Sequence, residues 1–167
     1  MIVPNSENLF SLCLASLWRT MDLIVVFAKA RLIDMSAATE GVTALLAKYN
    51  EALNASSTDA VMPLYTEDGV FMPPYSQSAV GAAAVRKAYG AVFKAITLNV
   101  KFAIAEIVEL GPGWAFARTN SAGTTTDHAT GAKSAEGNQE LFVLKRDDDG
   151  SWKIARYSFS PTNPPRH

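Results

Sequence analysis

Apolar residues recur with a helical period in the region from Ser36 to Ile96, and they recur with a strand-like period after Asn99. Between Ser36 and Asn54 the apolar positions fall at i, i+3, i+4, i+7 and i+11, which predicts an amphipathic helix. A second helix is expected from Thr58 to Tyr65, distorted by Pro63. A third is expected from Ala82 to Ile96. The two long stripes comprise Val42, Leu45, Leu46, Tyr49 and Leu53, and then Val85, Ala88, Tyr89, Val92, Phe93 and Ile96.

Strand-like segments bounded by turn residues make up the second half of the chain. Thr66 to Gly69 is predicted to be a turn, and Val70 to Met72 a short strand that Pro73 and Pro74 terminate. Four longer strands are expected, at Asn99–Leu110, Trp114–Thr126, 133–146 and Trp152–Ser160. Helices followed by a meander predict an α+β fold, a strongly curved antiparallel sheet wrapped on three helices with an apolar pocket between them.

The first 34 residues differ from the rest and predict an apolar appendage. Their two apolar runs, Leu9–Trp18 and Leu23–Ala28, are shorter than the roughly 20 residues that span a bilayer. The segment is interpreted as an added helix, a dimer contact, or upstream sequence before a start at Met21 or Met35. Three regions result: residues 1–34, a domain over 35–161, and a tail over 162–167. A cytoplasmic location is expected, with a secretory signal cleaved near Ala30 as the alternative.

Composition narrows the class of protein. Hydrophobic residues make up 49% of the chain and charged residues 19%, which excludes wholesale disorder. The net charge of -1 gives no sign of a basic nucleic-acid-binding face. Cys13 is the single cysteine, so an internal disulfide and a cysteine-rich metal site are excluded. No phosphate-binding glycine loop or nucleophile elbow occurs, and His128 is read as a solvated loop residue, so neither a cofactor nor a metal is expected.

The long hairpin that follows Trp114 predicts where a pocket lies. A turn centred on Ala129 would place Arg118 opposite Glu140 and Asn120 opposite Asn138 on one face of the sheet. The same face would carry Trp114, Phe116 and Phe142. The other face would carry the small residues Ala115, Ala117, Thr119 and Ser121, which suit close packing against a second sheet in a homodimer.

Two readings of the expected Arg118–Glu140 pair stay open. A buried ion pair usually costs more in desolvation than it returns, so the pair is either structural or the polar anchor of a ligand. Glu140 is the candidate base, because burial among rings would raise its pKa while Arg118 would lower it.

Several segments together resemble the NTF2-like superfamily, in its SnoaL-like and ketosteroid-isomerase-like branch of small bacterial proteins. The resemblance rests on KYNEALN at 48–54, YTEDGVF at 65–71, RKAY at 86–89 and LFVLKRDDDGSWKIARYSFS from residue 141. It implies a cone-shaped sheet, a pocket at the open end and a homodimer. It also implies that Tyr157 and Phe159 face the pocket and that Arg156 points outward.

The resemblance does not extend to isomerase chemistry. Tyr49 matches the oxyanion tyrosine and Tyr89 a supporting tyrosine, but the base aspartate falls on Pro73 and the second aspartate on Phe142. Steroid isomerisation is therefore not expected, unless Glu140 serves as the base from an adjacent position in the strand ladder.

The preferred hypothesis is a small-molecule binding protein, or a cofactor-independent enzyme, that holds an apolar or aromatic ligand in the cone. Glu140 and Tyr49 are the candidate catalytic residues. The alternative is a dimeric scaffold module with a vestigial pocket, as in kinase association domains; an open cavity or solid packing distinguishes the two. The predicted ligand-binding residues are Tyr49, Phe71, Tyr89, Trp114, Phe116, Arg118, Asn120, Asn138, Glu140, Phe142, Tyr157 and Phe159.

Overall fold

The computed structural model describes Lys29 and residues 37–163. The chain divides into two compact units, Met1–Ala37 and Ala38–His167, and the account below concerns the second. The predictions for residues 1–34 and for the end of the tail lie outside the described residues, and the predicted region boundaries and cytoplasmic location stay predictions. No helix in the described part of the chain is both long and apolar enough to cross a membrane.

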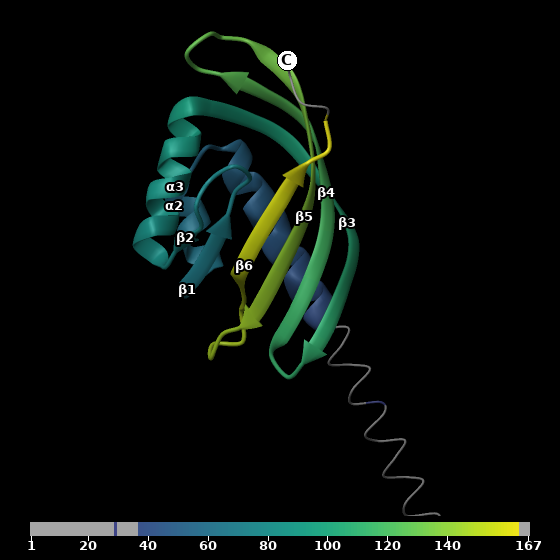
Figure 1. Ribbon diagram of the computed structural model, residues 1–167. Coiled ribbons are helices and arrows are strands. Elements are labelled where there is room, and N and C mark those ends of the chain that lie inside the picture. Colours follow the sequence, from purple (N-terminus) through teal and green to yellow (C-terminus); the bar gives the residue numbers. More distant parts are fainter. Residues whose placement is uncertain (1–28, 30–36, 164–167) are drawn as a thin grey trace, which may run out of the picture. The chain divides into compact units, whose positions relative to one another are not determined.

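Three helices and one six-stranded sheet form the second unit (Figure 1). The sheet order is β2-β1-β6-β5-β4-β3, and every neighbouring pair is antiparallel except β1 and β6, which are parallel. The α+β fold is confirmed, but the sheet is mixed rather than antiparallel throughout. The elements are the long helix (37–54), α2 (Thr58–Val61), the 3-10 turn η1 (Met62–Leu64), β1 (Tyr65–Met72), β2 (Ala79–Val80), α3 (Ala82–Ala95), β3 (Ile96–Gly111), β4 (Trp114–Asp127), β5 (Lys133–Arg146) and β6 (Trp152–Pro161).

The helices follow the predicted stripes. All five stripe residues of the long helix are buried, from Val42 to Leu53. Ser57 caps α2 by accepting a hydrogen bond from the Ala60 amide at 3.1 Å. The distortion expected at Pro63 is confirmed, since the chain tightens there into a 3-10 turn before β1 begins.

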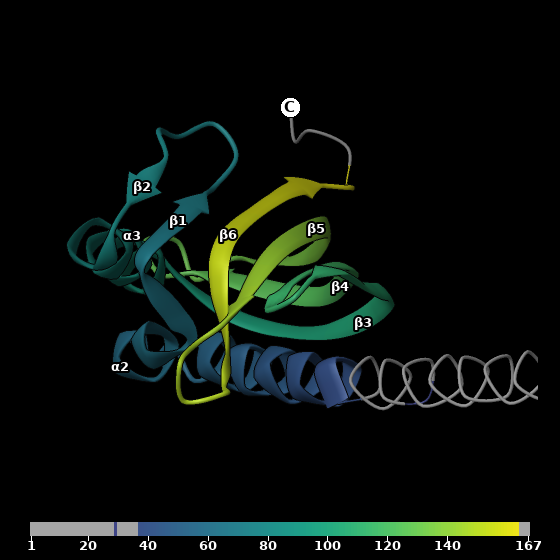
Figure 2. The same cartoon turned by 90° about the horizontal axis from the view of Figure 1, so that it is seen from below.

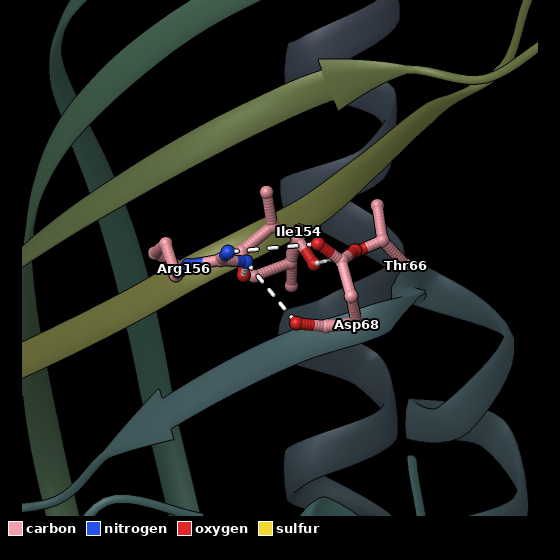
Figure 3. A network of polar contacts seen from close by, with 5 residues as sticks. Thr66, Asp68, Ile154 and Arg156 are labelled. Atoms are coloured by element: carbon pink, nitrogen blue, oxygen red, sulfur yellow. Dashed lines mark hydrogen bonds and ion pairs between the residues drawn. The ribbon is translucent and has the colours of Figure 1, made fainter. Parts of the chain in front are cut away.

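The turn predicted at Thr66–Gly69 is wrong, because β1 runs through it with an irregularity between Tyr65 and Val70. Arg156 on β6 holds this irregular stretch (Figure 3). Its guanidinium donates to the carbonyl of Asp68 at 3.2 Å and lies 3.5 Å from the Asp68 carboxylate. Thr66 donates to the Ile154 carbonyl at 3.5 Å. These contacts bridge the two strands where the regular ladder is interrupted.

The long helix lies against the concave face of the sheet and caps its free edge strand, β3 (Figure 2). Asn50 and Asn54 both donate to the Val100 carbonyl at 2.8 Å. Asn54 also accepts from the Val100 amide at 2.9 Å, and Asn50 from the Phe102 amide at 3.3 Å. Two side-chain amides thus complete backbone hydrogen bonding that an edge strand lacks.

The β4–β5 hairpin pairs one residue away from the predicted register. Thr119 lies opposite Glu140, and Arg118 opposite Leu141. The loop holds four residues between the last bonded pair, in which the Asp127 amide donates to the Ala132 carbonyl at 2.9 Å. The prediction assumed a loop with an odd number of residues. Because side chains alternate between faces, the shift by one turns every predicted β4 residue to the other side of the sheet.

Candidate functional site

A cavity of about 110 Å³ lies between the concave face of the sheet, the long helix and α3. Its wall is mostly apolar and aromatic, with a small polar group contributed by β4 and β5. The lining residues are Tyr49, Leu53, Phe71, Pro73, Tyr89, Val92, Ile96, Leu98, Val100, Phe102, Ser121, Glu136, Asn138, Glu140, Tyr157 and Phe159. The cavity is open space rather than solid packing, yet it is smaller than the roughly 300 Å³ typical of pockets for drug-sized ligands.

Three tyrosine hydroxyls form a chain at one end of the aromatic core. The Tyr49 and Tyr89 hydroxyl oxygens are 2.5 Å apart, and those of Tyr65 and Tyr89 are 2.8 Å apart. Burial raises the pKa of all three well above the usual value, and it does the same for Tyr157. These hydroxyls therefore stay protonated at neutral pH and can serve as hydrogen-bond donors but not as bases.

Stacked rings hold the pocket tyrosines rigidly. Phe71 stacks on Tyr89 with centroids 4.7 Å apart and on Tyr157 at 5.6 Å. Phe142, which is fully buried, stacks on Tyr157 at 4.3 Å and meets the edge of Tyr49 at 5.6 Å. Such ring contacts stabilise beyond their buried area and leave these rings little rotational freedom.

Glu140 is the acidic group of the site, on β5 and only 2% exposed. Thr119 on β4 donates to its Oε2 at 2.5 Å, while Oε1 has no hydrogen-bond partner among the described residues. Burial raises the pKa of Glu140, and the Ser121 hydroxyl, which lies near the carboxyl group without meeting hydrogen-bond geometry, and the Thr119 hydroxyl oppose that rise only in part. An unpaired carboxyl oxygen at an apolar cavity is costly to bury and suits a ligand donor or a proton transfer.

Asn138 and Glu136 extend this polar wall along β5. The Asn138 amide nitrogen donates to Glu136 Oε1 at 3.0 Å and to the Ser121 hydroxyl at 3.4 Å. This pairing leaves the Asn138 carbonyl oxygen buried and without a partner among residues 37–163. The described residues contain no group of three or more His, Cys, Asp or Glu side chains that could hold a metal ion.

The structure brings together seven of the predicted ligand-binding residues at the cavity. An eighth, Phe142, lies in the core behind Tyr49 and Tyr157 and is not part of the lining. Arg156 points outward, as expected, where it binds Asp68. The seven lining residues are Tyr49, Phe71, Tyr89, Asn138, Glu140, Tyr157 and Phe159.

The four residues predicted on β4 do not reach the cavity, because the register places them on the outer face. Arg118 is half-exposed there and pairs with Glu106, its Nε 2.7 Å from Oε1. The expected Arg118–Glu140 pair is therefore wrong. The small residues expected on the outside, Ala115, Ala117, Thr119 and Ser121, are buried on the inner face. The residues that the register turns outward are Trp114, Phe116, Arg118 and Asn120.

Sequence reasoning missed the hydroxyls of Thr119 and Ser121 and the wall contributed by β3. The hydroxyls were missed because the predicted β4–β5 register was shifted by one residue, which placed both side chains on the outer face. The β3 wall had a signal in the sequence, since Ile96, Leu98, Val100 and Phe102 alternate with polar or small residues at period two.

A curved sheet closed over helices, with an aromatic cavity on its inner face, defines the cone fold of NTF2-like proteins. The chain belongs to the SnoaL-like domain family, whose model matches residues 46–157. No curated protein matches the chain.

Solved structures place the chain in the same fold. A ketosteroid isomerase-like protein from Erwinia carotovora atroseptica is 37% identical, with a TM-score of 0.71 over 73% of this chain and 94% of that one. An NTF2-like superfamily protein from Salmonella enterica is 15% identical, with a TM-score of 0.68 over 80% and 99%. A cystatin-like protein from Caulobacter vibrioides is 18% identical, with a TM-score of 0.63 over 76% and 91%. The last two show the fold alone.

Proposed function

We propose that this protein binds a small organic molecule in the aromatic cavity and that Glu140 is the polar anchor of the ligand. The observation that carries the proposal is the Glu140 carboxyl group, which is buried at the cavity and has one oxygen without a hydrogen-bond partner in the described part of the chain. Burial of an unpaired polar atom costs roughly 1–3 kcal/mol, which a purely structural position would avoid with an apolar side chain.

Proton transfer to or from the ligand is the reaction that this site supports best. A carboxyl group with a raised pKa is a better base near neutral pH than an exposed one, and the protonated Tyr49 can donate to a developing negative charge. Pro73, on which the family's base aspartate falls by the sequence resemblance, lines the cavity and has no proton to exchange, so the base in this proposal is Glu140.

A ligand screen by protein-observed NMR tests the proposal. Compounds that shift the resonances of cavity residues in the wild type should lose at least about tenfold in affinity in Glu140→Gln, or in Tyr49→Phe for ligands that reach the tyrosine chain. Arg118→Gln, on the outer face, is the control and should bind as the wild type does. If both pocket variants bind every hit unchanged, the site assignment is incorrect.

A dimeric scaffold module is the second candidate function. It is favoured by apolar side chains on the outer face of β4 and β5, where Trp114 is 40% and Leu141 48% exposed, and by the small size of the cavity. This reading predicts self-association without any cavity ligand. The two functions are compatible, since the cavity and the outer face lie on opposite sides of the sheet.

A further inference from the structure

The charges that line the cavity all have the same sign. Glu136 and Glu140 contribute carboxyl groups, and no lysine, arginine or histidine lines the cavity in the described part of the chain. Arg118, the partner that the sequence predicted for Glu140, lies on the opposite face of the sheet and pairs with Glu106. An anionic ligand would therefore meet repulsion and no counter-charge, whereas a cation would meet attraction in a region of low dielectric.

The unpaired polar atoms of the cavity are both acceptors. Glu140 Oε1 and the Asn138 carbonyl oxygen are buried and without a hydrogen-bond partner among residues 37–163. They belong to residues two apart on β5, so both side chains leave the same face of the strand, roughly 6–7 Å apart at the backbone. The Asn138 orientation follows from its partner, because only the amide nitrogen can donate to the Glu136 carboxylate. A ligand that satisfies both oxygens must bring at least two donors.

The remaining wall suits a positively charged group on an apolar body. Six aromatic rings line the cavity, and the face of an aromatic ring attracts cations. The space of about 110 Å³ is smaller than an engineered cavity of about 150 Å³ that holds benzene, so the body of the ligand is limited to one ring at most. The rings are Tyr49, Phe71, Tyr89, Phe102, Tyr157 and Phe159.

We propose that the ligand of this cavity is a small organic cation, an ammonium or amidinium group with at least two N–H donors on a body of about one ring. The group donates to Glu140 Oε1 and to the Asn138 carbonyl, and its body packs among the rings. This inference rests on the proposed function of the cavity and adds the sign of the ligand's charge and the number of its donors.

Three probes of one size test the inference: benzylamine, benzyl alcohol and benzoate, titrated at pH 7.5 by calorimetry and by NMR. Benzylamine should bind about tenfold or more tightly than benzyl alcohol, the ratio expected for a charge-assisted hydrogen bond, and benzoate should bind most weakly. Glu140→Gln should remove the preference for the amine, and Glu136→Gln should reduce it. Glu51→Gln makes the same change of charge on the exposed side of the long helix and should leave the preference intact.

The outcomes separate this inference from the proposed function. Equal binding of the amine and the alcohol, tighter binding of benzoate, or an amine preference that survives in Glu140→Gln overturns the cationic ligand while the binding function stands. If neither these probes nor any compound of the wider screen shifts cavity resonances, the binding function fails as well. Glutamine keeps an acceptor oxygen for Thr119, so Glu140→Gln should fold. If it does not fold, the same comparison of probes is made with Glu136→Gln, which removes the other carboxylate that lines the cavity.

Discussion

Two buried side chains at the cavity carry polar atoms without a hydrogen-bond partner among residues 37–163. Thr119 donates to one oxygen of Glu140, whereas the other oxygen of Glu140 and the Asn138 carbonyl oxygen have no partner there. The neighbouring tyrosine hydroxyls do pair with one another, in the Tyr49–Tyr89–Tyr65 chain. Buried polar groups are usually hydrogen-bonded, so the two acceptors on β5 are the exceptions.

The raised pKa of Glu140 predicts how stability depends on pH. A carboxyl group with a raised pKa binds its proton more tightly in the folded than in the unfolded state, so it favours folding below its ordinary value of 4.5. That contribution is lost as the pH rises through the folded pKa. The free energy of unfolding of Glu140→Gln should therefore increase relative to that of the wild type as the pH rises. At pH 8 the variant should be more stable by roughly 1–2 kcal/mol.

Urea denaturation of the two proteins between pH 4 and pH 8 measures this difference. Glu51→Gln is the control, because it makes the same change of charge at an exposed position on the long helix. A wild type that gains stability over Glu140→Gln as the pH rises would show that the folded protein prefers the charged form, contrary to this account.

At the scale of elements, the sheet and the long helix depend on close contacts at a few positions. Gly123 on β4 lies opposite Val100, and a Cβ built there would stand 2.0 Å from the Asn99 carbonyl oxygen. The two strands thus approach each other where the sheet curves over α3. The same part of β3 receives the side chains of Asn50 and Asn54.

Gly123→Ala should destabilise the protein by about 2 kcal/mol or more, because the contact is with backbone and cannot be relieved by a side-chain rotation. Gly90→Ala is the matched control. Gly90 lies in α3 with open space around it, so alanine should stabilise the helix by roughly 0.5–1 kcal/mol. Thermal and urea denaturation give both values, and a neutral Gly123→Ala would mean that the strands can separate freely at this point.

Asn54→Ala should weaken the edge strand locally, because it removes one donor to the Val100 carbonyl and the acceptor of the Val100 amide. The expected loss is roughly 1–3 kcal/mol. Amide hydrogen exchange should show faster exchange at Val100, while β5 in the middle of the sheet changes only as much as global stability does. Unchanged protection at Val100 would contradict the capping role.

The second unit as a whole has two unlike faces on one sheet. The inner face carries the cavity, and the outer face of β3, β4 and β5 carries exposed apolar residues beside the Arg118–Glu106 ion pair. The small residues from which the homodimer was predicted lie on the inner face instead, so the homodimer stays a prediction that now rests on the exposed apolar residues of the outer face. The exposed apolar residues there are Val108, Trp114 and Leu141.

Leu141→Lys should shift the protein from dimer to monomer in sedimentation velocity, because a charge in the middle of an apolar contact leaves an unpaired group buried. Val80→Lys is the control. Val80 is exposed and apolar as well, but it lies on β2 at the other end of the sheet, and its replacement should leave the sedimentation coefficient unchanged. A wild type that sediments as a monomer at all concentrations rules out this dimer.

Local sequence determined which segments form helices and strands, because those choices rest on spacing within ten to twenty residues. The helical stripe from Val42 to Leu53, the break at Pro63 and the strand ends near Gly113 and Gly150 could all be predicted in this way. The burial of Tyr49 was predicted from its helical stripe, and that of Tyr157 from the resemblance to NTF2-like proteins. Glu140 was predicted on the same face of β5 as Phe142, and both are buried.

Tertiary structure alone decided which β4 residues face the cavity and how β1 joins the sheet. The facing of Arg118 or Thr119 depends on whether the loop after Asp127 has an even or an odd number of residues, and that parity is set by hydrogen bonds at its tip, not by the apolar pattern of the strand. β1 continues through Thr66–Gly69 because Arg156, 88 residues after Asp68, holds it to β6. Contacts between distant residues carry no local signature, and the chemistry of this site rests on them.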